Sequence, residues 1–140
     1  MMRAFTAMEV RQAVRGRWIL RQESLPIRSV SINSRTRIDN GLFVAIVGDR
    51  FDGHEFLAAA AENGAILAIV DDHHTIPDEI VSLFRVGVIA VEDTRLALLE
   101  LAGFYRSVLP ARIVAITGSN GKTTVKEMLH SVLAKRLSGT

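Results

Sequence analysis

The sequence predicts a mixed α/β fold in which short strands alternate with helices. Apolar runs of about five residues recur along the 140-residue chain, and segments with three- and four-residue apolar spacing lie between them. Glycine or proline ends three of the predicted helices, at Gly16, Gly64 and Pro110. A chain of this length fits one domain, or one small domain and part of another.

The first predicted helix covers residues 7 to 15. Thr6 to Glu9 has the spacing of a capping box, in which a cap residue and an acid three positions later bond each other's backbone N–H groups. Phe5 and Val10 lie at the positions of a hydrophobic staple, and Gly16 is a suitable end for the helix.

Three short strands are predicted next, over residues 18–20, 29–32 and 42–46. The third is expected to be buried, because it is uniformly apolar and follows turn residues at positions 39–41. Trp18, in the first strand, is expected in the core or in an interface rather than as a platform for stacking a base.

A second helix start lies at Asp52, which is followed three residues later by an acid and has Phe51 and Phe56 at staple positions. This pattern predicts a helix over residues 53–63. Gly64 is expected to end the helix as a C-terminal cap, because glycine adopts the left-handed conformation without steric cost.

Two more strands are predicted over residues 66–70 and 86–91, with a polar loop at 71–78 between them. A helix over 94–108 follows, and Pro110 ends it. One face of this helix is expected to pack in the core: Leu98, Leu101, Ala102, Tyr105 and Val108.

Composition argues against several classes of protein. The net charge of +2 is too small to indicate a nucleic-acid partner, and the absence of cysteine excludes disulfides and thiolate metal sites. The apolar runs are too short to span a bilayer, and no secretory signal is visible. His73 and His74 have no third ligand at helical spacing, so no metal site is expected there. We expect a monomeric, cytoplasmic protein without membrane insertion.

A glycine-rich loop, Thr117 to Thr124, follows a predicted strand at 112–116 and precedes a predicted helix at 122–136. This arrangement is typical of sites for nucleotide polyphosphates, because backbone N–H groups and the positive end of the helix point at one anion. The residues expected to contact the nucleotide are Gly118, Ser119, Asn120, Gly121, Lys122, Thr123 and Thr124.

Lys122 and Thr123 are the predicted catalytic residues of this loop. Lys122 would reach the outer phosphates, and the Thr123 hydroxyl would help to hold Mg²⁺. The loop is shorter than the general form, because Ile116 stands where the first glycine would fall. Out of context so short a motif is also compatible with a plain strand-to-helix turn.

These residues resemble the Mur ligases, the cytoplasmic enzymes that extend the peptide of the peptidoglycan precursor. The loop at 117–124 is similar to the ATP loop of that family, and the shorter spacing is the family's own form. Other segments resemble the N-terminal domain shared by two family members, in unbroken order from about residue 5: Asn33 to Arg35, Leu42 to Ala45, Gly48 to His54, and Gly64 to Ala65.

The resemblance implies two domains. Residues 1–110 would form a small mixed α/β domain that binds the UDP end of the precursor through Ser34, Arg35 and His54. Residues 111–140 would be the first strand, P-loop and helix of an ATPase domain that binds ATP and Mg²⁺. From the residues alone, Ser34 could simply end a strand, Arg35 could be a solvated charge, and His54 could either contact a phosphate or pack.

The resemblance also implies a reaction. ATP phosphorylates a substrate carboxylate, and an amine then attacks the acyl phosphate to give an amide, ADP and phosphate. Three segments favour the member that joins D-alanyl-D-alanine to UDP-N-acetylmuramoyl-tripeptide: Gly48 to Phe56, Val91 to Ala97, and Thr123 to Met128. The member that adds the third amino acid to the dipeptide precursor is the nearest alternative.

The chain departs from the family pattern at Asn33, where Asp or Thr is common, and at residues 39–40, where a Pro-Gly pair is common. Family members also continue through the rest of the ATPase domain and a third domain, so we expect the 140-residue chain alone to be inactive. Two other functions remain open. One is a non-catalytic module that binds UDP-sugars, and the other is a small P-loop kinase or regulatory NTPase.

Overall fold

The computed structural model describes residues 3–110 and 122–133 of the chain. It divides into two compact units, Met1–Ser107 and Val108–Thr140. The first unit contains a complete sheet with helices on both faces. In the second unit the structure describes one helix, α5 (Lys122–Leu133), together with the end of α4 and the residues directly after it.

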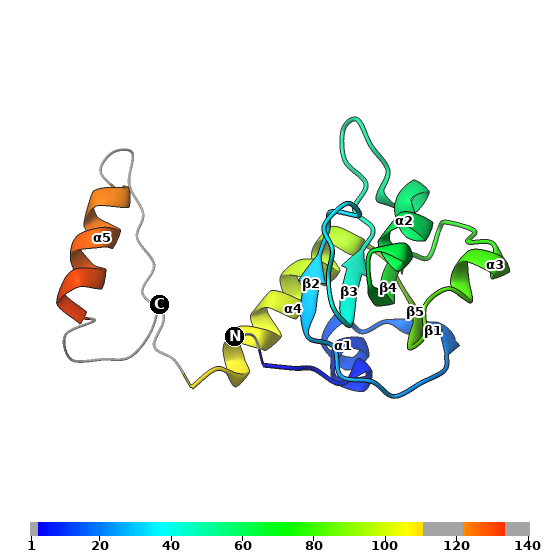
Figure 1. Ribbon diagram of the computed structural model, residues 1–140, viewed down its shortest axis with the longest axis horizontal. Helices are drawn as coiled ribbons and strands as arrows, with labels where there is room; N and C mark the ends of the chain where they lie inside the picture. Colours follow the sequence, from blue (N-terminus) through cyan, green and yellow to red (C-terminus); the bar gives the residue numbers. More distant parts are fainter. Residues whose placement is uncertain (1–2, 111–121, 134–140) are drawn as a thin grey trace. The chain divides into compact units, whose positions relative to one another are not determined.

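The first unit is built on a five-stranded sheet with the order β1-β5-β4-β3-β2 (Figure 1). Strands β2 to β5 run parallel to their neighbours, and β1 pairs antiparallel with β5 at one edge. The predicted α/β class is therefore confirmed. The strands are β1 (Arg17–Arg21), β2 (Ser29–Ser31), β3 (Gly41–Val44), β4 (Ala65–Asp71) and β5 (Gly87–Val91).

Helices cover both faces of this sheet, as expected for parallel strands that are apolar along their whole length. Alternate residues of β3 divide between two cores: Leu42 and Val44 belong to one cluster, and Phe43 belongs to the other. The first cluster includes residues of α1 (Ala7–Val14) and α4 (Thr94–Val108), and the second includes residues of α2 (Leu57–Glu62) and α3 (Asp78–Val81).

The N-terminus of α1 has the predicted capping box. The Thr6 hydroxyl accepts a hydrogen bond from the Glu9 N–H at 3.1 Å, and the Glu9 carboxylate accepts one from the Thr6 N–H at 2.8 Å. Phe5 and Val10 are buried in the same core cluster. The helix ends one residue earlier than predicted, because Arg15 already adopts the left-handed conformation, with φ at 54°.

The helix predicted over residues 53–63 has two parts, a 3₁₀ turn η1 (Gly53–Phe56) and then α2. Asp52 caps it, but its carboxylate accepts from the His54 N–H at 3.0 Å, which is one residue earlier than in a capping box. Gly64 ends α2 with φ at +103°, as predicted. A Cβ at Gly64 would also collide with the Ile38 carbonyl oxygen, so the site needs glycine for space as well.

Two sequence predictions are wrong in detail. The polar loop predicted at 71–78 is followed at once by a short helix, α3, which the sequence did not reveal. Ala102 of α4 is exposed rather than in the core, whereas Ala97 and Leu101 are buried. The core face lies on the Tyr105 side of α4, because Phe5 packs there with its ring centroid 5.3 Å from that of Tyr105.

No helix among residues 3–110 and 122–133 has both the length and the apolar character needed to cross a membrane.

Candidate functional site

The predicted UDP-contact residues Ser34 and Arg35 lie in the connection between β2 and β3. The Ser34 carbonyl accepts a hydrogen bond from the Asn63 side-chain amide at 2.8 Å, so this part of the connection is attached to the end of α2. Arg35 is exposed, and its N–H donates to the Asn33 side-chain oxygen at 3.0 Å. Asn33 therefore shapes an Asx turn, which an Asp at this position would form equally well.

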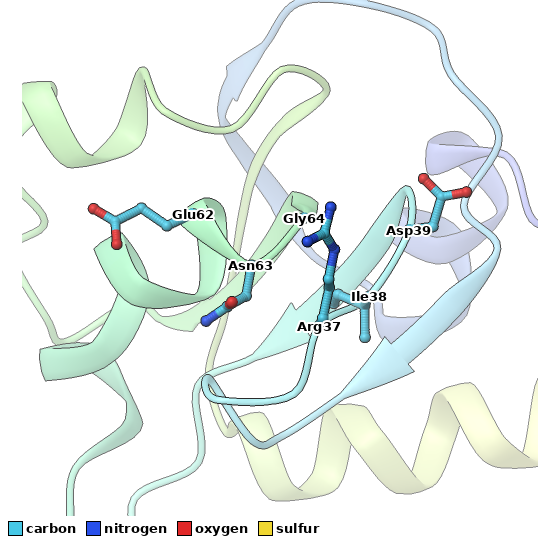
Figure 2. A pocket seen from close by; sticks show the side chains of 6 residues that line it. All are labelled: Arg37, Ile38, Asp39, Glu62, Asn63 and Gly64. Carbon is cyan, nitrogen blue, oxygen red and sulfur yellow. The ribbon is translucent and has the colours of Figure 1, made fainter.

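A pocket of about 410 Å³ lies beside this connection. Figure 2 shows its six lining residues, which come from the β2–β3 connection and from the end of α2. One guanidinium and two carboxylates line it, so it carries no positive excess that would attract a pyrophosphate. The lining residues are Arg37, Ile38, Asp39, Glu62, Asn63 and Gly64.

The third predicted contact residue, His54, lies in η1 and has partners of its own. Its Nδ1 is 2.6 Å from an Asp52 carboxylate oxygen, and its Nε2 accepts a hydrogen bond from the Asp71 N–H at 2.9 Å. Nε2 is thus an acceptor, which assigns the ring proton to Nδ1. The side chain is only 4% exposed. Among the described residues, no hydrogen bond links His54 to Ser34 or Arg35.

His74 completes a cluster that we call the His54–His74 clamp, formed by Asp52, His54 and His74. The His74 Nε2 lies 2.8 Å from the second Asp52 oxygen, and the two imidazole rings stack at 3.7 Å with planes 5° apart. The His74 Nδ1 is buried without a hydrogen-bond partner among the described residues. The clamp joins the loop after β4 to the loop after β3.

The pKa of Asp52 is lowered to about 2 by this environment. Burial acts to raise the pKa, because it disfavours the charged carboxylate, but the hydrogen bonds outweigh burial. These bonds come from the His54 backbone N–H and from the side chains of His54 and His74. Asp52 is therefore an ionised acceptor at neutral pH.

The three residues of the clamp are close enough to hold a metal ion, since each offers a ligand atom within 4.8 Å of the others. The protonation of His54 argues against that use. A metal on Nδ1 would move the ring proton to Nε2, where the Asp71 N–H already donates. The clamp is arranged as a hydrogen-bonded link between two loops.

Sequence reasoning missed the part of His74 in this cluster, because its partners are about 20 residues away along the chain. One available signal was its position. Asp52 follows β3 along the chain, Asp71 is the last residue of β4, and His74 follows β4. The carboxyl ends of neighbouring parallel strands meet at one edge of the sheet.

The predicted phosphate loop lies largely outside the described residues, which resume at Lys122. Residues Lys122–Leu133 form α5, within the helix predicted over residues 122–136. Thr123 and Thr124 are exposed in the first turn of α5, with their side chains open to solvent. The nucleotide contacts of the whole loop stay predictions: Gly118, Ser119, Asn120, Gly121, Lys122, Thr123 and Thr124.

Comparison with known proteins identifies the family. Residues 26–106 match the family model described as "Mur ligase family, catalytic domain", which is more than half of the chain. The matched region contains the β2–β3 connection, the clamp and strands β2 to β5. The chain belongs to the Mur ligase family.

Two curated relatives show which members it resembles. UDP-N-acetylmuramoyl-tripeptide–D-alanyl-D-alanine ligase of Haemophilus influenzae is 37% identical over 115 residues, covering 82% of this chain and 24% of the relative. UDP-N-acetylmuramoyl-L-alanyl-D-glutamate–2,6-diaminopimelate ligase 2 of Clostridium acetobutylicum is also 37% identical over 115 residues, covering 79% of this chain and 22% of the relative. The chain thus spans about a quarter of the length of these relatives.

Solved structures support the same assignment. A crystal structure of MurF from Acinetobacter baumannii has a TM-score of 0.79 and 34% identity, and the match covers 96% of this chain and 28% of that chain. MurF from Thermotoga maritima in complex with ADP has a TM-score of 0.64 and 33% identity, over 79% of this chain and 24% of that chain.

Proposed function

We propose that the chain is part of an ATP-dependent ligase that joins D-alanyl-D-alanine to UDP-N-acetylmuramoyl-tripeptide. The observation that carries this proposal is the match to MurF of Acinetobacter baumannii over 96% of the chain. The name of the relative from Haemophilus influenzae agrees with it. In the reaction, the γ-phosphoryl group of ATP passes to the substrate carboxylate. The dipeptide amine then displaces phosphate from the acyl phosphate and forms the amide.

The glycine loop supplies the nucleotide site in this proposal. Lys122 neutralises charge on the phosphates, and Gly118 to Gly121 donate backbone N–H groups. The Thr123 hydroxyl suits a Mg²⁺ ion held with the nucleotide, because the residue is exposed in the first turn of α5. The ADP complex of the relative from Thermotoga maritima supports a nucleotide in this family.

The nucleotide site is tested by titrating the 140-residue chain with Mg-ADP. Lys122→Ala is expected to weaken binding at least tenfold, since it removes the one side-chain cation that the loop offers to the phosphates. Lys126→Ala is the matched control, because it removes an exposed lysine one turn further along the same helix. Equal affinities for the two variants would contradict the assignment of Lys122.

The UDP end of the precursor is proposed to bind along the β2–β3 connection. Arg35 is free to approach the pyrophosphate because it is exposed, and the Ser34 hydroxyl adds a donor beside it. The mixed charges of the pocket at Arg37 suit the neutral uridine better than the phosphates. His54 contributes by fixing the loop after β3 through the clamp, since both ring nitrogens already have partners.

This part of the proposal is tested by NMR titration with UDP-N-acetylmuramoyl-tripeptide. We expect amide shifts at Arg35 and its neighbours, and a loss of affinity of roughly tenfold in Arg35→Ala. Arg17→Ala, an exposed arginine of edge strand β1, should bind like the wild type. No shifts at millimolar ligand would overturn the proposed substrate site.

The ligase that adds the third residue is the second candidate function, because the relative from Clostridium acetobutylicum has the same identity, 37% over 115 residues, as the relative from Haemophilus influenzae. The two functions differ in the precursor, which is a dipeptide in one and a tripeptide in the other. Ligase assays on the parent protein with each precursor and its amine would distinguish them. Product from diaminopimelate and the dipeptide precursor would replace the first proposal with the second.

A further inference from the structure

Asn63, the residue directly after α2, holds the β2–β3 connection at two points. Its side-chain amide donates to the Ser34 carbonyl at 2.8 Å, and its own carbonyl accepts from the Ile38 N–H at 2.8 Å. The two bonds bracket residues 34–38. This stretch carries Arg35, so the amide fixes the backbone from which a proposed ligand contact projects.

The backbone contacts of Asn63 and Gly64 fix only the later part of the connection, from Ile38 to Gly41. The Gly64 carbonyl accepts from the Gly41 N–H at 3.2 Å, and Gly64 approaches the Ile38 carbonyl too closely for any side chain at position 64. The Ser34 peptide lies before these contacts. In the part of the chain that the structure describes, the Asn63 amide is the group that ties the Ser34 carbonyl to the rest of the fold.

We propose that Asn63 is a positioning residue for the UDP-precursor site. It orients the Ser34–Arg35 peptide, and it also lines the pocket beside that peptide (Figure 2). This inference rests on the proposed function of Ser34 and Arg35. Asn63 itself acts through Ser34, because its amide is engaged with the Ser34 carbonyl and not with open solvent.

Asn63→Asp separates this role from a general contribution to stability. The substitution keeps the side-chain shape but removes the donor, so a carboxylate oxygen faces the Ser34 carbonyl. The Ile38 bond to the backbone carbonyl of residue 63 is retained, since it does not involve the side chain. The substitution therefore releases only the part of the connection at Ser34.

Gln22 offers a matched control at the other edge of the sheet. Its side-chain amide donates to the Phe84 carbonyl at 3.1 Å, so it makes the same type of bond in a place remote from the pocket. Gln22→Glu therefore removes one amide donor from one backbone carbonyl, as Asn63→Asp does. Both variants should lose similar stability in urea denaturation, because a net hydrogen bond of this kind contributes about 0.5 to 1.5 kcal/mol.

The test compares the two variants of the full chain in UDP-N-acetylmuramoyl-tripeptide binding and in amide hydrogen exchange without ligand. Asn63→Asp is expected to bind roughly tenfold more weakly than Gln22→Glu, at equal stability. It should also speed exchange of the Arg35 and Thr36 amides, while the Ile38 amide keeps its protection.

Each result has a distinct meaning. Equal affinity of the two variants, with ligand binding intact in the wild type, would overturn the positioning role and leave the proposed function standing. Absence of binding by the wild type would overturn the proposed function, and the positioning role with it. Unchanged exchange at Arg35 and Thr36 would overturn the claim that Asn63 orders the peptide, whichever way binding turned out.

Discussion

Asp52 shows how much one side chain can do where parallel strands end. It caps η1 through the His54 N–H, and its two carboxylate oxygens accept from two stacked imidazoles. A single carboxylate thereby holds the loop after β3 against the loop after β4. Because both imidazoles favour the charged carboxylate, acid should weaken this link.

The effect of acid on Asp52 is a testable prediction. The folded-state pKa is about 2, below the ordinary value of 3.8. A carboxyl group with a lowered folded pKa contributes its full stability above about pH 4 and loses it as the pH falls toward 2. The difference in the free energy of unfolding between wild type and Asp52→Asn should therefore shrink over this range by up to about 2 kcal/mol.

Urea denaturation at pH 5, 4, 3 and 2.5 measures that difference. Asp49→Asn is the control for the substitution itself, because Asp49 is an exposed aspartate of the same loop. The lowered pKa of Glu9 affects all three proteins equally and cancels from the comparison. A constant difference for Asp52→Asn would contradict a lowered pKa.

Residue-scale features were predictable where they depend on neighbours in the sequence. The capping roles of Thr6 and Asp52 follow from spacings of two or three residues, and both are present. The link from His74 to Asp52 was not predicted, because it joins residues that the pairing of β3 with β4 brings together. The tautomer of His54 likewise depends on the distant Asp71 N–H.

At the scale of elements, the turn from α2 into β4 is fixed by Gly64. Its positive φ and its approach to the Ile38 carbonyl both exclude a side chain. Gly64→Ala should therefore reduce the free energy of unfolding by about 2 to 4 kcal/mol, since it combines backbone strain with a steric collision. Urea denaturation monitored by circular dichroism measures this loss.

Gly103→Ala provides the matched control for that prediction. Gly103 lies within α4 and a Cβ there meets nothing within 4 Å, so alanine should stabilise the helix by about 0.5 to 1 kcal/mol. Opposite signs for the two substitutions are expected. A loss at Gly103 as large as that at Gly64 would show that the close approach to Ile38 is not the cause.

The predictability of elements depended on their length. The eight-residue α1 was predicted from its capping box, and the fifteen-residue α4 from its apolar periodicity. The four-residue α3 was missed, because it is shorter than the pattern that would reveal it. The face of α4 was partly wrong at Ala102, because it is set by packing against Phe5, which lies about 100 residues earlier.

On the scale of the whole molecule, both core clusters lie within residues 5–101. A chain that ends after Pro110 should therefore keep the circular dichroism of the first unit. Its midpoint of urea denaturation should equal that of the full chain. A chain that ends after Glu100 should unfold, because it loses Leu101 from the core and Phe104 and Tyr105 from its edge. If the chain that ends after Pro110 had a lower urea midpoint than the full chain, this would contradict an independently stable first unit.

The fold class was predictable because strands and helices alternate along the sequence, whereas the strand order was not. Local patterns identify β1 and β5 as strands, but they do not reveal that Arg17 pairs with Ala90. The features of the candidate site also divide into those that the sequence could predict and those that it could not. Ser34 and Arg35 stand in a recognisable segment, while the bond from Asn63 to Ser34 depends on how α2 meets the β2–β3 connection.

The antiparallel edge strand has a consequence for synthesis on the ribosome. β1 cannot pair until β5 has been synthesised. Phe5 cannot pack against Phe104 and Tyr105 until those later residues have been synthesised. At about 5 to 20 residues per second, the segment Arg17–Arg21 remains without its partner strand for roughly 4 to 15 s. β1 and Phe5 therefore complete their contacts only after the other strands of the sheet have been synthesised.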